Sequence, residues 1–348
     1  MTTGTRLGAI VFAFLSSFVL AQTKQETPAS ETNGKIYLDA VVSTNGGAPV
    51  AGLEQKDFTV LDNKVAQPIA SFEALGGEKA PVEVLVVVDA VNTSFSIVAA
   101  ERDQIARFLH ANGGHLAHPV KLAFFTEKGL EMQPQPSTDG NSLSAALDSY
   151  EVRLRTIRRS SGIYGADERL QLSLNMVRQL AQQEAAQPGR KMVFWISPGW
   201  PMLSGPNVVQ LTPKQQQQLF ANIVALSTGL RAARMTLYAL DPVGADESVM
   251  HGSYYMSFVK GVAKPRDAGF GKLALQVLAT QTGGLVVNSN DLTELFGRCV
   301  KDAEAYYEIA FVPAPDHGEQ RDVYHQVEVK VARPGLPVRT LQGYYSNP

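Results

Sequence analysis

The sequence predicts an α/β fold, a doubly wound and mostly parallel sheet, inserted into a β-sandwich that both chain ends build. Two observations predict this. From Pro81 onward, short apolar runs typical of buried strands alternate with amphipathic helical segments. On either side lie roughly 40 residues of β character, too few for a stable domain alone. One sandwich made from both ends solves this, since chain ends that lie close together tolerate an inserted domain.

The N-terminus has the features of a secretory signal peptide over residues 1–21. Arg6 precedes an apolar run at 7–15, and Val19-x-Ala21 suits cleavage by a peptidase. The run is shorter than the ~20 residues that span a bilayer. We therefore expect an exported chain, periplasmic or extracellular, with no membrane span. Residues 22–34 are polar and predict a disordered leader.

The first part of the sandwich is predicted over 35–80, with strands at 36–42, 58–63 and 69–72 and a turn at Asn45-Gly46-Gly47. The last part is predicted over 305–348. Within it, residues 325–331 alternate strictly between polar and apolar, which indicates a strand with one solvated face.

The α/β domain is predicted over 81–304. Its first strand, 84–88, is unbroken in apolar character, as expected when helices cover both sheet faces. Ser96 can cap the next helix, Thr212-Pro213 starts another, and Asn290 can cap the last. The lone cysteine, Cys299, falls in an apolar helical pattern that favours a buried thiol. The remaining strands are predicted at 122–125, 192–196, 235–240 and 285–287, and the remaining helices at 143–154, 170–180 and 272–280.

Polar residues follow several of these strands. Asp89, Ser197 and Asp241 come at strand ends, so we expect them at one edge of the sheet, where open α/β sheets bind ligands. The loop that contains Ser161 precedes a helix and can reach the same edge.

These motifs resemble the von Willebrand factor A-type domain, and more closely a bacterial subgroup related to it. The resemblance rests on Asp89 with the hydroxyl residues after it and on three stretches: AGLEQKDFTV at 51–60, GRKMVFWISPG at 189–199, and RPGLPVR at 333–339 with Gly343-Tyr344-Tyr345. It covers essentially the whole mature chain and implies that fold. It also implies a metal-ion-dependent adhesion site.

That implied metal site departs from the family pattern. Asp89, Thr93 and Ser161 match ligand positions, but Val91 and Pro198 stand where the family has Ser and Asp. Mg²⁺ needs oxygen ligands in near-octahedral geometry. We expect no cofactor, or weak Mg²⁺ or Mn²⁺ with Asp241 as a further ligand. In the alternative interpretation, Asp89 accepts backbone N–H bonds and the hydroxyl residues cap the next helix.

A partner surface is expected in the long segment 243–269, which contains Tyr254, Tyr255, Met256 and Phe258, with Trp200 at its border. Such residues are typical of protein interfaces, although they can equally pack as a local mini-core. The net charge of -2 gives no basic field for nucleic acid.

The sequence therefore favours a non-enzymatic, exported protein-binding module. The alternatives are an envelope hydrolase that uses the edge with Asp89, Ser161 and Asp241, and an inert structural component of the envelope.

Overall fold

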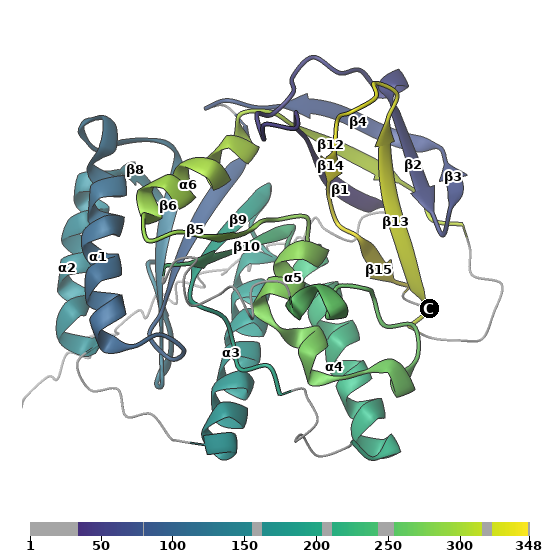
Figure 1. Cartoon of the computed structure of the whole chain (residues 1–348). Helices are drawn as coiled ribbons and strands as arrows, with labels where there is room; N and C mark the ends of the chain where they lie inside the picture. Colours follow the sequence, from purple (N-terminus) through teal and green to yellow (C-terminus); the bar gives the residue numbers. More distant parts are fainter. Residues whose placement is uncertain are drawn as a thin grey trace, which may run out of the picture.

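The computed structural model describes residues 34–78, 80–154, 162–203, 211–242, 254–314 and 322–346. Three sheets organise this part of the chain, one mostly parallel and two antiparallel. In Figure 1 the mostly parallel sheet lies among the helices, and the antiparallel strands lie at the upper right. The predicted signal peptide and nearly all of the predicted leader fall outside the described residues.

The central sheet confirms the predicted mostly parallel arrangement. Its main path runs β11-β10-β9-β5-β6-β7, in which only β7 is antiparallel to its neighbour, and β8 also pairs with β6. β5 and β9 are almost entirely buried, which explains their continuous apolar sequences. The strands are β5 (Val82–Asp89), β6 (His115–Thr126), β7 (Gly129–Met132), β8 (Ser137–Asp139), β9 (Arg190–Ile196), β10 (Met235–Asp241) and β11 (Val286–Asn288).

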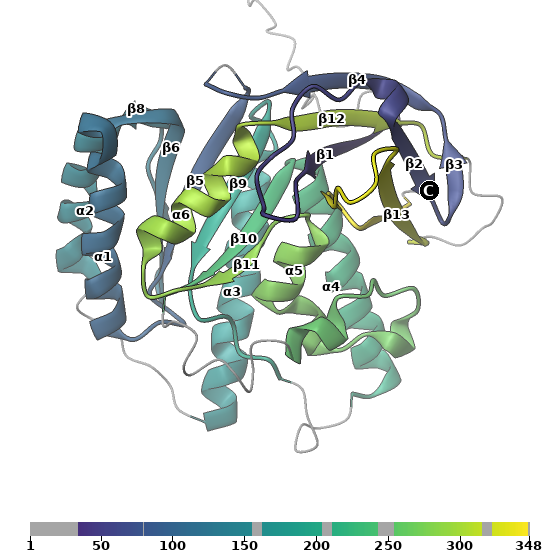
Figure 2. The ribbon, with the colours of Figure 1, turned by 45° about the horizontal axis from the view of Figure 1, so that its top comes forward.

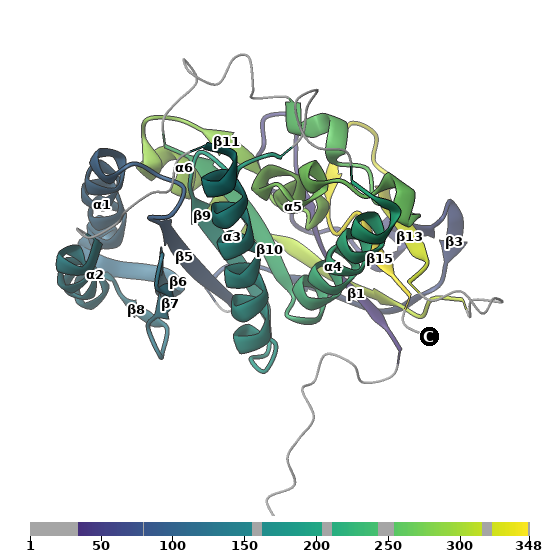
Figure 3. The ribbon, with the colours of Figure 1, turned by 90° about the horizontal axis from the view of Figure 1, so that it is seen from below.

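Helices cover both faces of this sheet, as Figure 3 shows from below. Alternate strand residues enter two separate cores, with Val86 in one and Val87 in the other. One core is completed by α1 (Phe95–His110), α2 (Gly140–Leu154) and α6 (Leu292–Val300). The other is completed by α3 (Gly162–Glu184), α4 (Pro213–Ala232) and α5 (Leu275–Gln281). The described 3-10 helices are η2 (Gln55–Asp57), η3 (Ala111–Gly114), η4 (Tyr254–Phe258), η5 (Pro265–Asp267), η6 (Phe270–Leu273) and η7 (Lys301–Ala303).

The two antiparallel sheets combine strands from both chain ends. Their orders are β14-β1-β12-β4 and β15-β13-β2-β3, and a third hydrophobic core contains residues of both. Figure 2 shows these strands beside the α/β part. The N-terminal strands are β1 (Ile36–Val42), β2 (Phe58–Asp62), β3 (Val65–Gln67) and β4 (Ile69–Leu75). The C-terminal strands are β12 (Tyr306–Phe311), β13 (Tyr324–Val331), β14 (Val338–Arg339) and β15 (Gly343–Tyr345).

Buried polar contacts join the antiparallel strands to the central sheet. The guanidinium of Arg190 donates to the main-chain oxygen of Asp302 (3.0 Å) and to the hydroxyl of Tyr238 (3.0 Å). Arg339 of β14 pairs with the same aspartate at 2.5 Å. Buried ion pairs of this kind add little net free energy of folding, because the cost of desolvating the charges offsets their attraction. Their main effect here is to fix how the two parts are oriented.

Two local predictions were correct and two predicted helix caps were wrong. Thr212 and Gln215 form the capping box that starts α4, and Cys299 is buried. The cap of α1 is Ser94 rather than Ser96, and Asp291 rather than Asn290 caps α6. The hairpin of β6 and β7 was not predicted. No helix in the described part of the chain is long and apolar enough to cross a membrane.

Candidate functional site

The carboxyl ends of three parallel strands meet at one level of the central sheet. Val88 of β5 lies opposite Ile196 of β9, which in turn lies opposite Leu240 of β10. The next residues, Asp89, Ser197 and Asp241, therefore share one edge, as the sequence predicts. Ser161 lies outside the described residues.

The Asp89 carboxylate accepts four hydrogen bonds. Its Oδ1 accepts from the main-chain N–H groups of Val91 (3.0 Å) and Asn92 (2.9 Å). Its Oδ2 accepts from the amide Nδ2 of Asn92 (2.8 Å) and from the indole Nε1 of Trp195 (2.9 Å). A carboxylate offers about four lone-pair sites, so these donors use its full capacity.

Burial and hydrogen bonding act in opposite directions on Asp89. The residue is 0% exposed, and this burial raises the pKa of its carboxyl group. The hydrogen bonds from Trp195, Asn92 and Val91 favour the charged form and limit that rise. The carboxylate thus serves as a buried acceptor that joins β5, β9 and the loop before α1.

Of the other predicted ligand positions, the structure describes Thr93 and Asp241, and the positions of Val91 and Pro198 supply no side-chain oxygen. Val91 is a core residue, and the main-chain oxygen of Pro198 accepts from Gln276 Nε2 at 3.2 Å. Thr93 is buried, and its hydroxyl has no hydrogen-bond partner among the described residues. Asp241 pairs with Asn288 in the β10–β11 ladder.

The carboxylate of Asp89 offers no free lone pair to a divalent cation in this arrangement. Mg²⁺ and Mn²⁺ need several oxygen donors with unused lone pairs, and Asp89 has none left. Within the described residues, no group of three or more His, Cys, Asp or Glu side chains could hold a metal ion.

Sequence reasoning missed Glu101, a buried carboxyl group near the same edge. Neither of its oxygens has a hydrogen-bond partner in the described part of the chain. Burial raises its pKa to about 9, and the charges of Asp89 and Asp241 add to the rise. Its sequence signal is an acidic residue at helical spacing between Val98 and Ile105, on the apolar stripe of α1.

The predicted partner residues divide into exposed and packed groups. Tyr254 is 43% exposed and Met256 is 58% exposed. Phe258 packs against η6, because a Cβ atom on Gly271 would come within 2.7 Å of its ring. Tyr255 is half-buried. The segment therefore packs on one side and exposes Tyr254 and Met256 on the other, and the partner surface stays a prediction.

Trp200 does not belong to an exposed surface. It is 3% exposed and packs edge-to-face on Trp195, with ring centroids 5.0 Å apart. The prediction that Trp200 borders a partner surface is wrong for its side chain, because the ring turns back onto the core below α3 and α4.

Tyr164 is a further exposed aromatic residue that sequence reasoning missed. Its side chain is 88% exposed near the start of α3. Farther along α3, Ser173 accepts a hydrogen bond from Asn92 at the sheet edge. Since a helix rises 1.5 Å per residue, Tyr164 lies about 13 Å beyond that level. α3 therefore projects past the edge, as Figure 1 shows at its lower end.

Comparison with known proteins gives structural similarities only. No family model matches the sequence, and the comparison with curated proteins found no match. The structural neighbours include proteins with von Willebrand A-type domains. Human COPII-coat protein Sec24c is 10% identical, with a TM-score of 0.38 over 79% of this chain and 44% of its own. The pilus adhesin SpaC of Lactobacillus rhamnosus GG is 10% identical, with a TM-score of 0.37 over 86% of this chain and 48% of its own.

A third neighbour, manganese-loaded TRAP protein of Plasmodium vivax, is 9% identical, with a TM-score of 0.33 over 78% of this chain and 96% of its own. The chain spans about half of the length of the first structures that it matches.

Proposed function

We propose that this chain is an exported, non-enzymatic protein-binding module of the von Willebrand A type. The observation that carries the proposal is the set of exposed apolar side chains on α3 and η4. Tyr164, Tyr254 and Met256 are three of the five large hydrophobic residues most exposed in the described structure. Aromatic residues and methionine are enriched in protein interfaces.

We also propose that the antiparallel strands form one β-sandwich into which the α/β domain is inserted, with boundaries near residues 81 and 304. This is supported by the pairing of β1 with β12 and of β2 with β13, which links both chain ends. The sandwich would then carry the module and leave its opposite edge free for a partner.

In this proposal the metal site is degenerate. Its aspartate has kept a scaffold role, because Asp89 holds the loop before α1 through two main-chain N–H groups. Partner binding would then rely on apolar contact and shape rather than on a shared cation.

A hydrolase that uses the edge with Asp89, Ser161 and Asp241 is a second candidate. It is favoured by Glu101, since a buried carboxyl group with a raised pKa near a sheet edge is a common property of general acids. A serine-directed fluorophosphonate probe distinguishes the candidates, because labelling at Ser161 that requires Glu101 supports a hydrolase. An inert structural component of the envelope would show neither labelling nor a partner.

Photo-crosslinking in native cells tests the binding module. A benzophenone amino acid at position 256 should give a discrete adduct with one protein. The control position is Val65, which is similarly exposed but lies on β3, in one of the antiparallel sheets. The same adducts from both positions, or none from position 256, would contradict the proposal.

A further inference from the structure

The strand β7 forms an open edge of the central sheet. The main-chain N–H of Gln133 donates to the oxygen of Leu122 in β6 (3.0 Å). In an antiparallel pair, successive residues direct their main-chain groups alternately toward and away from the partner strand. The N–H and C=O groups of Leu130 and Met132 therefore face away from β6, and no described strand pairs with that side.

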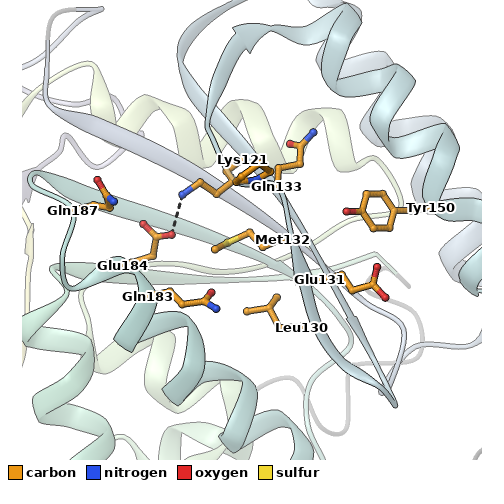
Figure 4. A pocket seen from close by; sticks show the side chains of 10 residues that line it. Lys121, Leu130, Glu131, Met132, Gln133, Tyr150, Gln183, Glu184 and Gln187 are labelled. Atoms are coloured by element: carbon orange, nitrogen blue, oxygen red, sulfur yellow. Dashed lines mark hydrogen bonds and ion pairs between the residues drawn. The ribbon is translucent and has the colours of Figure 1, made fainter. Parts of the chain in front are cut away.

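A pocket of about 570 Å³ lies beside this edge. Leu130 and Met132 of β7 line it together with Gln133, and Gln183, Glu184 and Gln187 line it from the end of α3. Figure 4 shows Met132 and Leu130 facing the α3 side chains, with Glu131 and Tyr150 on the other side of the hairpin. Its volume is in the range of specific ligand sites, which is about 300–1,000 Å³.

The wall of the pocket holds a buried carboxylate oxygen that has no hydrogen-bond partner among the described residues. The ammonium group of Lys121 lies 2.9 Å from a carboxylate oxygen of Glu83 and 2.9 Å from one of Glu184. Two carboxylates thus contact this ammonium group, and the charge of Lys191 acts on the same two carboxylates. The side chain of Glu184 is 2% exposed, and its Oε2 has no hydrogen-bond partner among the described residues. A buried carboxylate oxygen of this kind favours a charged donor beside it, because charge-assisted hydrogen bonds are the stronger ones.

We propose that this pocket is a second binding site, which takes an extended peptide segment of a partner protein. The segment adds as a strand to β7 and pairs with the outward main-chain groups of Leu130 and Met132. A Lys or Arg side chain of the segment enters the pocket toward Glu184. The amide groups of Gln183 and Gln187 provide further hydrogen-bond partners at its rim.

The strand edge and the charge together select this occupant. A free amine or guanidinium would use the carboxylate but leave the outward groups of β7 without partners. A peptide without a donor side chain at this point would pair with β7 but leave Oε2 of Glu184 without a partner. A strand with a Lys or Arg side chain uses both features. Because side chains alternate along a strand, every second residue lies on the sheet face that carries Leu130 and Met132.

An NMR titration of the isotope-labelled protein tests this proposal. The probe is the peptide acetyl-Thr-Val-Thr-Arg-Thr-Val-Thr-amide, added to about 1 mM, which detects even weak association. Amide signals of Leu130, Met132 and Glu184 should shift. The shifts should be lost when citrulline replaces arginine and when the peptide backbone is N-methylated at alternate residues. Capped arginine alone should bind at least tenfold more weakly.

Two variants with matched controls locate the site. Glu184→Gln neutralises the buried triplet and should weaken binding at least tenfold, whereas Glu127→Gln, an exposed change, should not. Met132→Pro removes an outward N–H without breaking the ladder to β6 and should weaken binding, whereas Met132→Leu retains that N–H and should not.

The absence of any shift at about 1 mM peptide would overturn the proposal. Equal binding of the citrulline peptide would overturn the charge argument, and equal binding of capped arginine would overturn the strand.

Discussion

The indole Nε1 of Trp195 donates a 2.9 Å hydrogen bond to Oδ2 of Asp89 and completes a set of four donors around that carboxylate. A tryptophan near the end of β9 thus occupies an acceptor position that a metal ion would need. This relationship changes Asp89 from a prospective ligand into an anchor that joins two central strands to the loop before α1.

Asp89→Ala should destabilise the fold by about 1–3 kcal/mol, because it leaves two main-chain N–H groups and the Trp195 indole without their acceptor in a buried place. Chemical denaturation measures this. Asp139→Ala is the matched control: Oδ1 of Asp139 accepts the N–H groups of Asn141 (3.0 Å) and Ser142 (3.2 Å) in the same pattern, but at an exposed helix start. The idea fails if the two losses are equal.

Calorimetric titration with Mg²⁺ or Mn²⁺ should detect no binding tighter than about millimolar, the range of weakly liganded cation sites. The reason is that the four donors around Asp89 leave no lone pair for the ion. Micromolar binding that disappears in Asp89→Ala would show that an ion displaces Trp195 or Asn92 and that the site is functional.

Glu101→Gln should make the protein more stable at high pH. The pKa of Glu101 is about 9 in the folded chain, against an ordinary value of 4.5, so between these pH values the folded state keeps a proton that the unfolded state loses. The free energy of unfolding therefore falls as pH rises, with a slope that approaches about 1.4 kcal/mol per pH unit for this group. Glutamine has no such proton.

Denaturation curves of the wild type and Glu101→Gln at several pH values check this. Their difference in stability should be smallest near pH 4 and should grow toward pH 9. Glu127→Gln, at an exposed position, should give curves parallel to the wild type. A constant difference across this range would mean that Glu101 is already ionised.

Met256→Ala and Phe258→Ala should separate the surface of η4 from its packed side. Phe258 lies against Gly271 and makes an edge-to-face contact with Tyr254, with ring centroids 5.3 Å apart. Its loss should cost about 2 kcal/mol or more. Met256 is mostly exposed, so its loss should change the melting temperature little. Equal destabilisation by both changes would mean that the whole segment packs inward.

Val329→Ala tests whether both chain ends share one cooperative unit. Val329 of β13 pairs with Val60 of β2, and both belong to the third core. Hydrogen exchange should accelerate in β1 and β2 as well as in β13. Val287→Ala, a buried change in β11, is the control and should affect β10 first. Unchanged protection of residues 36–62 in Val329→Ala would rule out a shared unit.

The sequence alone determined the features that depend on local chemistry. Continuous apolar runs predicted the buried strands, and the Thr212 and Gln215 pair predicted the start of α4, because capping is decided within one helical turn. The strict alternation of β13 predicted a strand with one solvated face. The shared edge of Asp89 and Asp241 followed from the rule that parallel strands end together.

The tertiary structure alone decided what those edge residues do. Trp195 meets Asp89 because β5 and β9 pair with Val87 opposite the tryptophan, and the strand sequences carry no record of that register. Glu101 loses its solvent only when α1 packs against the sheet. Trp200 is buried because its ring turns back onto Trp195 rather than outward. The hydrogen bonds that saturate Asp89 and the burial of Glu101 and Trp200 arise from contacts between distant segments. Tertiary packing therefore decides which side chains at this edge stay available to a ligand.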